Sequence, residues 1–557
     1  MCHCASTTLT QKHTGRHLKT SHVPPLVGNP LDQNAVLSLH RLLDAAVAAT
    51  AGKQSLTNMV LVLLPLLREL GIAVLRCIME HRDQLLDRDR PQLPCRGCAT
   101  VLTRTRNVRQ TNCYTLFGKL IFNRRNYLCS KCKRSEYPLD WSLKLLDRCA
   151  GHSDEFASMV VLLTTLLPNA KAMCLFHKCF GFEVSTQLAR TLSFEIGHEL
   201  HCQQADRAEH YWKLRTEDPE KLEPVPAVLR QMQRKKRMYF MLDDSKLGIQ
   251  EGARGRGAKR RIAEFSPAEK ALRKALQQEK RKAVQAAKKT KPGPDEPAKV
   301  PKAVAQTDDG GYRNVRALLI FEATDLAGVS KGRCQILRKR IVAHIGTLEE
   351  WRKFVYMALV ESGTLTAHEV FVIADGGTGI WEMVEELLPS TGFRKVIHVL
   401  DFYHASSHLW AAGRAYKGND TAERRRQCIK WVTPLLADLK EGRVANVIQR
   451  LGALKVKGAA AEEIAKVKKY FETHRKRMRY AWLRDQQALI GSGAMESVHT
   501  WVIQARCRLP GMRWSAVGAN AMLRLRCAWA SDTWNESFQL AAVAPPRLAG
   551  KALKLQI

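Results

Sequence analysis

The sequence predicts a multidomain α+β protein, and three observations lead to this fold class. The chain has 557 residues, 45% of them hydrophobic, so it has room for several domains with apolar cores. Two Cys-x-x-Cys pairs indicate a small metal-binding module. Later in the chain, apolar runs typical of buried strands alternate with helical segments, as in a mixed α/β sheet. We expect a flexible tail (1–30), a helical N-terminal region (31–90), a zinc ribbon (91–150), a helix-turn-helix (151–215) and a mixed α/β domain (230–557).

The chain is strongly basic. Lys and Arg number 89 and Asp and Glu number 53, which gives a net charge of +36. Such a chain is expected to bind polyanions, with nucleic acid as the default partner; a generally basic, soluble protein is the alternative. The longest apolar run (59–79) is interrupted by Pro65 and three charged residues, so it predicts a buried helix rather than a membrane span. Because the N-terminus has no secretory signal, we expect a cytoplasmic protein whose 16 cysteines are reduced or metal-bound.

The first 30 residues are polar. Cys2, Cys4, His13 and His17 could be interpreted as a metal site, but the Cys-x-Cys start has the wrong spacing for a zinc finger. A flexible tail is therefore the preferred interpretation. Helical periodicity follows over residues 33–88.

Four cysteines have the spacing of a Cys₄ zinc ribbon. Cys95 and Cys98 form one Cys-x-x-Cys pair, and Cys129 and Cys132 form a second pair after 30 intervening residues. The intervening segment alternates like strand material, with Gly118 at a turn. Four thiolates fill a tetrahedral Zn²⁺ shell, so the predicted site is structural. Two unrelated pairs of buried thiols are the alternative.

Residues 154–201 predict three helices. Pro168 lies at the start of the second helix, and Ser185 is a good N-cap for the third. A helix, a short Gly-containing turn and a capped helix form the layout of a helix-turn-helix, and also of an ordinary helical hairpin. If this segment docks on DNA, the early part of the third helix supplies the contacts: Thr186, Gln187 and Arg190.

Residues 251–311 interrupt the α/β domain. This insert is Gly- and Arg-rich, then Ala-rich and charged, then Pro-rich, and it has no core of its own. It is expected to be a mobile basic linker. Two roles remain open, which are non-specific contact with phosphates and a solvated loop with no defined role.

Three acidic residues have the setting of divalent-metal ligands. Asp243 and Asp375 each follow an apolar run that predicts a buried strand, and Glu496 lies in the first turn of a predicted helix. Such a set can hold two Mg²⁺ ions, which clamp the attacking and leaving oxygens of a phosphodiester. Asp244 points to the opposite face of its strand from Asp243, so only one of the two can face the site, and we favour Asp243. The alternative for Glu496 is an acid favoured by the helix dipole.

The segments around these acids predict a mixed sheet with function at the carboxyl ends of its strands, where Asp243, Asp375 and Asp401 lie. The helix of Glu496 is predicted to bury one apolar stripe and to project Glu496 toward a cleft or solvent. The stripe consists of Val498, Trp501, Val502 and Ala505. The remaining predicted strands are 312–323, 333–346, 369–375 and 395–401, and the helices are 347–363, with Thr347 as the cap, and 379–390.

The chain resembles bacterial insertion-sequence transposases of the DDE type, in particular the ISKra-type group of the Mutator-like superfamily. The resemblance covers roughly residues 90–540 in order. The chain departs from the family at the first acid, where Asp-Gly is usual and Asp243-Asp244 stands. The motifs that carry the resemblance are Asp375-Gly376 followed by Trp381, HVLDFYHASSHLW (398–410) and GSGAMESVHTWVIQARCRLPGMRWS (491–515).

The resemblance implies an RNase H-like catalytic domain with an all-helical insertion at residues 405–490. It implies hydrolytic nicking and strand transfer with two Mg²⁺ or Mn²⁺ ions, beside the structural Zn²⁺. The implied partners are double-stranded DNA, as element ends and target, and a second copy of the chain. Asp401 and His404 are expected to steady DNA or the helix of Glu496, with a buried structural pair as the alternative.

Four residues of the C-terminal block are candidate DNA contacts: Arg506, Arg508, Arg513 and Trp514. Packing beneath a C-terminal helix is the alternative for Trp514. Two rival functions stay open at this point. One is a DNA-binding protein that keeps the fold without catalysis, and the other is a related nuclease such as a junction resolvase.

Overall fold

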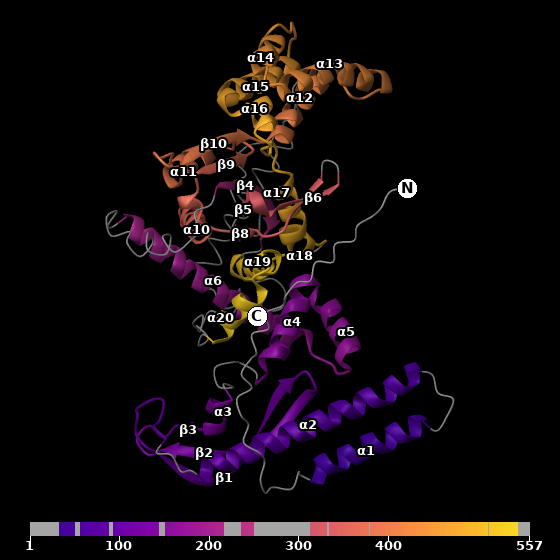
Figure 1. Cartoon of the computed structure of the whole chain (residues 1–557), viewed down its shortest axis with the longest axis vertical. Helices are drawn as coiled ribbons and strands as arrows, with labels where there is room; N and C mark the ends of the chain where they lie inside the picture. Colours follow the sequence, from indigo (N-terminus) through magenta and orange to yellow (C-terminus); the bar gives the residue numbers. More distant parts are fainter. Residues whose placement is uncertain are drawn as a thin grey trace, which may run out of the picture. The chain divides into compact units, whose positions relative to one another are not determined.

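The computed structural model describes residues 33–50, 56–88, 93–143, 151–216, 236–249, 312–330, 333–377, 379–510 and 512–543. The chain is a multidomain α+β protein that divides into two compact units, residues 1–153 and 154–557 (Figure 1). The predicted tail (1–30) and basic insert (251–311) lie outside the described residues. No described helix combines the length and the apolarity that crossing a membrane requires.

The first unit begins with two helices packed on each other, α1 (Gln33–Thr50) and α2 (Leu56–Arg88) (Figure 1). Helix α2 also packs on the strand hairpin that follows it. Ile72, Leu75 and Met79 of α2 lie against the buried side chains Leu120 and Phe122. The helical N-terminal region and the cysteine-bearing segment, which the sequence predicts as separate domains, thus share one core.

The hairpin consists of two long antiparallel strands, β1 (Leu102–Thr115) and β2 (Gly118–Cys129), with β3 (Ser135–Glu136) beside β2. Gly118 lies at the turn with a φ of 136°, a region that residues with a Cβ rarely adopt. The short helix α3 (Pro138–Ser142) follows and packs on β2 and α2.

The second unit begins with three mutually packed helices, α4 (Asp154–Leu166), α5 (Asn169–Phe180) and α6 (Thr186–Thr216). Helix α5 ends at Gly181, whose φ is 71°. As expected, the Ser185 hydroxyl caps α6, accepting a hydrogen bond from the Leu188 amide at 3.1 Å. Helix α6 is longer than the sequence predicts because its later turns pack on α10 and α19, described below.

A mixed five-stranded sheet forms the centre of the second unit, in the order β10-β9-β4-β5-β8. Strand β5 runs antiparallel to both of its neighbours, whereas β4, β9 and β10 are parallel. The strands are β4 (Arg237–Gly248), β5 (Tyr312–Glu322), β8 (Arg340–His344), β9 (Glu369–Ala374) and β10 (Lys395–Leu400).

The predicted third strand, 333–346, was wrong as a single element. It divides into β7 (Arg333–Ile336), which pairs with β6 (Leu326–Ser330) in a separate hairpin, and β8 of the main sheet. Leu337 in the intervening bend is 58% exposed, so the apolar run does not indicate one continuous buried strand.

Helices flank the sheet. Helix α10 (Leu348–Glu361) begins at the predicted cap, Thr347, which forms a capping box with Glu350. Helix α11 (Ile380–Leu387) links β9 to β10. Near the C-terminus, α19 (Ala516–Ala530) packs on α6 and β8, and α20 (Trp534–Val543) packs on α6.

The chain is helical between β10 and the segment of Glu496, where the resemblance places an insertion. The largest packing contacts there join α12 to α13 and to α15. The helices are α12 (Phe402–Lys417), α13 (Ala422–Lys440), α14 (Val444–Gly452), α15 (Ala459–His474) and α16 (Tyr480–Asp485), followed by α17 (Gly493–Val498), the π-helix η4 (His499–Gln504) and α18 (Ala505–Cys507).

Candidate active site and metal centre

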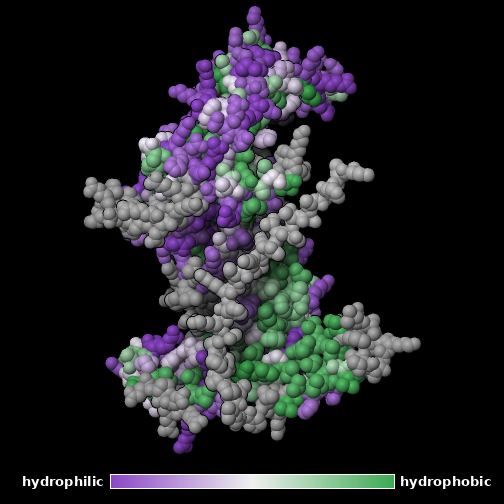
Figure 2. Space-filling model, in the orientation of Figure 1, coloured by the Kyte–Doolittle hydropathy of each residue, from purple (hydrophilic) through white to green (hydrophobic). Residues whose placement is uncertain are grey.

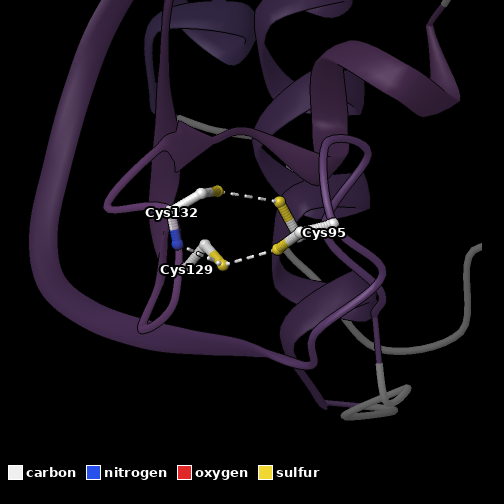
Figure 3. Close-up of side chains that lie close together, drawn as sticks. Cys95, Cys129 and Cys132 are labelled. Carbon is white, nitrogen blue, oxygen red and sulfur yellow. Dashed lines mark hydrogen bonds between the residues drawn. The ribbon is translucent and has the colours of Figure 1, made fainter.

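The four predicted cysteine ligands lie together in the first unit (Figure 3). Cys95 Sγ is 3.5 Å from Cys132 Sγ, and Cys98 Sγ is 3.4 Å from Cys129 Sγ. A tetrahedral Zn²⁺ with bonds of about 2.3 Å requires sulfur–sulfur distances of about 3.8 Å, so a small adjustment accommodates the ion. The cluster can therefore hold a structural Zn²⁺.

The two Cys-x-x-Cys turns have the same backbone conformation. In each turn the first cysteine's carbonyl accepts a hydrogen bond from the residue after the second cysteine, Ala99 at 2.8 Å and Lys133 at 3.0 Å. Both of those residues have positive φ, 58° and 54°. Hydrogen bonds with Thr100 lower the pKa of Cys98 to about 6, which favours the thiolate that binds metal.

Three aspartates lie in register on neighbouring parallel strands. Leu242 of β4 pairs with Ala374 of β9, which in turn pairs with Leu400 of β10. The next residue on each strand is an aspartate, so Asp243, Asp375 and Asp401 occupy equivalent positions on the same face of the sheet. This alignment depends on strand register and brings together residues up to 158 positions apart in the sequence.

The electrostatics of Asp243 agree with this alignment. Its pKa is raised to about 6, chiefly by burial and to a smaller extent by the charges of Asp375 and Asp401, whereas a hydrogen bond from the Asp244 amide at 2.8 Å opposes the shift. His499 Nε2 lies 3.4 Å from Asp243 Oδ2. A half-buried carboxylate beside two others is a site that favours a bound cation.

Asp244 lies on the other face of β4. Its carboxylate accepts a hydrogen bond from Asn314 Nδ2 at 3.4 Å. Burial raises its pKa, and the nearby charge of Arg316 opposes this shift. Strand β4 continues beyond both acids to Gly248, paired with β5, so the first acid is within the strand rather than at its last residue. Of the two, Asp243 faces the other aspartates.

Asp401 connects the strand ends to the segment that carries Glu496. One carboxylate oxygen caps α12 by accepting a hydrogen bond from the Tyr403 amide at 2.8 Å, and the other accepts one from the Ser492 hydroxyl. Ser492 directly precedes α17. Asp401 is 7% exposed, and its two carboxylate oxygens link the start of α12 to the residue before α17.

Glu496 is exposed on α17, which packs against β4 and β5. The carboxylates of Asp243, Asp375 and Glu496 do not all lie within 4.8 Å of one another, and neither do those of Asp243, Asp375 and Asp401. In the described part of the chain, the four cysteines are the one group of three or more Cys, His, Asp or Glu side chains whose ligand atoms lie within 4.8 Å of one another. The structure thus aligns the three aspartates on neighbouring strands, with Glu496 exposed on α17, but does not bring these acids into a ligand cluster.

The predicted apolar stripe after Glu496 was wrong for two of its four members. Val498 and Val502 are 4% and 1% exposed, but Trp501 is 64% exposed and Ala505 is also exposed. The reason is the π-helix η4, which changes the helical repeat and turns Trp501 away from the core.

Sequence reasoning missed an aromatic and histidine cluster beside Asp375. The Tyr470 hydroxyl donates to the Asp375 carbonyl at 2.9 Å, and the Tyr470 ring stacks on His408 at 4.0 Å and meets His474 at 4.8 Å. The predicted accessory residue His404 lies 5.1 Å from the His408 ring. The spacing of His404 and His408 on one helix was a sequence signal that could have indicated this cluster. No sequence pattern marked the residues that α15 contributes to it.

The predicted DNA-contacting residues lie in two places of the second unit. Thr186, Gln187 and Arg190 are exposed at the start of α6, and Arg508 and Arg513 are also exposed. One pocket of about 430 Å³ joins the two groups, since its lining includes Gln187, Arg190 and Arg513.

Two of the predicted contacts have structural roles. Arg506 is 2% exposed, and its guanidinium donates to the Thr164 carbonyl at 2.7 Å and to Asn169 Oδ1 at 3.0 Å. The prediction that Arg506 binds phosphate is therefore not supported in this conformation. Trp514 is half-buried and donates its indole N–H to the Cys507 carbonyl at 2.9 Å, which agrees with the packing alternative.

No known family model matches the chain, and no curated protein is similar enough to count as a match. The function must therefore be inferred from the site itself.

Proposed function

We propose that the chain is a DDE-type DNA transposase that binds the ends of an insertion sequence and catalyses metal-dependent strand cleavage and transfer. The observation that carries the proposal is the alignment of Asp243, Asp375 and Asp401 in register on three neighbouring parallel strands. Carboxylates placed this way are suited to hard divalent cations such as Mg²⁺. In a basic chain of net charge +36, the natural substrate of such a site is a phosphodiester.

Asp243 and Asp375 are the proposed ligands, with Glu496 as the third. Two bound Mg²⁺ ions would stabilise the attacking and leaving oxygens of the phosphodiester. Asp401 is assigned a positioning role through Ser492, because both of its oxygens are already bonded. Gly376, directly after Asp375, has a φ of 88°, a backbone conformation that glycine adopts more readily than other residues.

The architecture supports the same proposal. The second unit has the mixed sheet and the helical segment before Glu496 that the resemblance to DDE transposases implies for an RNase H-like domain. Helices α5 and α6 with the Gly181 turn and Ser185 cap are compatible with a helix-turn-helix, whose first exposed residues would face DNA. The hairpin with the four-cysteine cluster is compatible with a zinc ribbon.

Strand transfer at two element ends requires more than one copy of the chain, and the α1–α2 hairpin supports self-association. Its exposed apolar side chains include Leu43, Val47, Leu61 and Leu67, and Figure 2 shows apolar surface over these helices. The two helices carry five basic and five acidic residues, so they are neutral within a strongly basic chain. Two copies can therefore pair there without charge repulsion.

The exposed position of Glu496 favours a second candidate, a DNA-binding protein that has kept the fold without catalysis. One experiment separates the two. The full chain is incubated in Mg²⁺ or Mn²⁺ with DNA that carries the sequences flanking its own coding region. The transposase proposal predicts nicked and joined products that disappear in Asp375→Ala and Glu496→Ala.

Asp243→Ala and Asp244→Ala serve as a matched pair in the same assay. Loss of products with Asp243→Ala alone is expected, because Asp243 faces the other acids and Asp244 does not. If the wild-type chain binds these ends but yields no product, and the variants bind equally well, the binding-only candidate replaces the transposase.

A further inference from the structure

A groove of about 710 Å³ opens directly beside the proposed ligands. Its floor includes Met241 and Leu319, which pair with each other across β4 and β5. Met241 is two positions before Asp243, so the groove and that carboxylate lie on the same face of the sheet. Residues of α17 on either side of Glu496, Gly493 and Ser497, form part of its wall. The volume lies in the range of about 300–1,000 Å³ that small-molecule sites occupy.

Three exposed aromatic rings line this groove. Tyr403 is 66% exposed, Trp501 is 64% exposed and Trp529 is 39% exposed. Single exposed apolar side chains are ordinary, but three rings around one groove form an apolar surface that indicates a ligand. We call this site the Trp501 groove.

The local structure fixes two of these rings in their exposed positions. Trp501 is directed outward by the π-helix η4, whereas a regular helix would place it on the buried stripe with Val498 and Val502. A π-helix is an uncommon feature that is frequent at functional sites. Tyr403 lies over Gly491, where an added Cβ would come within 2.6 Å of the Tyr403 ring.

The chemistry of the groove fits a nucleobase. Aromatic rings stack on bases of every sequence, and a cation at the edge can neutralise the backbone. Lys339 contributes that cation to the lining. A second copy of this chain is a poorer occupant, because the net charge of +36 opposes contacts outside a neutral surface such as the α1–α2 hairpin.

Bases inside a duplex are stacked on each other, so a protein ring can stack on a base only where that base is unpaired. We propose that the Trp501 groove binds an unpaired nucleobase of the DNA strand that is cut at the neighbouring acids. This inference rests on the proposed function, because it places the bound strand next to the proposed catalytic residues. It adds to that function a stacking subsite that retains a strand end after cleavage.

The test measures the affinity of the full chain for a single-stranded oligothymidylate and for a duplex of the same length. The variants are Trp501→Ala and, as a matched control, Phe393→Ala. Phe393 is an exposed ring (53%) outside the groove. The expected result is single-strand binding that is roughly 5- to 150-fold weaker in Trp501→Ala only, with duplex binding unchanged. Because Trp501 is largely exposed, its removal leaves the core intact, which far-ultraviolet circular dichroism checks.

A second readout places the base in the groove. An oligonucleotide with 2-aminopurine near its end should lose fluorescence when bound to the wild-type chain, since stacking on an indole quenches it, and should keep its fluorescence with Trp501→Ala. Equal single-strand affinities of wild type and Trp501→Ala would overturn the inference, as would equal losses in both variants. A change in sedimentation of Trp501→Ala without DNA would overturn it in favour of a contact between copies.

Failure of this inference can be distinguished from failure of the proposed function. Loss of stacking in Trp501→Ala in a chain that never cuts DNA would retain the groove and remove the transposase proposal. Normal DNA cutting by the wild-type chain, together with unchanged single-strand affinity in Trp501→Ala, would retain the transposase proposal and remove the groove.

Discussion

Replacement of Asp401 by alanine is expected to loosen the segment that carries Glu496. The side chain removed is 7% exposed and makes two hydrogen bonds, one with the Tyr403 amide and one with the Ser492 hydroxyl. Loss of an N-cap costs about 1 kcal/mol, and loss of a hydrogen bond to a charged group costs about 2 kcal/mol. Removing a carboxylate that repels Asp243 offsets part of this, so we expect a net destabilisation of about 2 kcal/mol.

A double-mutant cycle isolates the contact that matters. Asp401→Ala, Ser492→Ala and the double variant are compared with wild type by urea unfolding. Tryptophan fluorescence is a suitable probe, because ten of the eleven tryptophans lie in the second unit. The predicted coupling energy is about 2 kcal/mol, the value of the bond between the two side chains.

Asp401→Asn is the control within this series. Asparagine is a good N-cap and keeps an acceptor for the Ser492 hydroxyl, so this variant should lose about 1 kcal/mol or less. The reasoning is refuted if the single losses are additive within about 0.3 kcal/mol, since Asp401 and Ser492 would then act independently.

Other predictions concern the rest of the chain. Cys129→Ser should abolish stoichiometric zinc measured by mass spectrometry, whereas Cys113→Ser, a buried thiol outside the cluster, should not; equal zinc in both would contradict the site. Burial lowers the pKa of His344 to about 3, so the unfolded chain takes up a proton below about pH 6.5 that the folded chain does not. Stability should therefore fall on acidification from pH 6.5, by about 1.4 kcal/mol per pH unit from this residue, and His344→Gln should remove that share in urea unfolding. The double change Leu61→Glu and Leu64→Glu should reduce self-association measured by sedimentation, and unchanged sedimentation would exclude the α1–α2 hairpin as the interface.

Local patterns were sufficient to predict several parts of the structure. The two cysteine turns are each formed by a few neighbouring residues, so their spacing predicted the cluster of Cys95 and its three partners. The apolar run that ends in aspartate predicted the position of Asp375 directly after β9, because the end of a buried strand is a local event, whereas β4 continues past Asp243 to Gly248. The register between β4 and β9 aligns these two aspartates, and no local sequence pattern specifies that register.

Features that depend on distant contacts could not be predicted. Arg506 was expected on the surface, but its guanidinium is bonded to a carbonyl 342 positions away, at Thr164. The exposure of Trp501 follows from a π-helix that differs from a regular helix by one residue per turn, which apolar spacing alone does not distinguish. Tyr470 reaches Asp375 from a helix 95 positions later, so their proximity is a property of the folded chain.

The most direct test of the central claim is Mn²⁺ binding to the full chain, measured by electron paramagnetic resonance, with Zn²⁺ supplied to saturate the cysteine cluster. The account predicts that wild type and Asp244→Asn bind Mn²⁺, and that Asp243→Asn and Asp375→Asn lose this binding. Retention of Mn²⁺ by both Asp243→Asn and Asp375→Asn would contradict a divalent-metal site at Asp243 and Asp375.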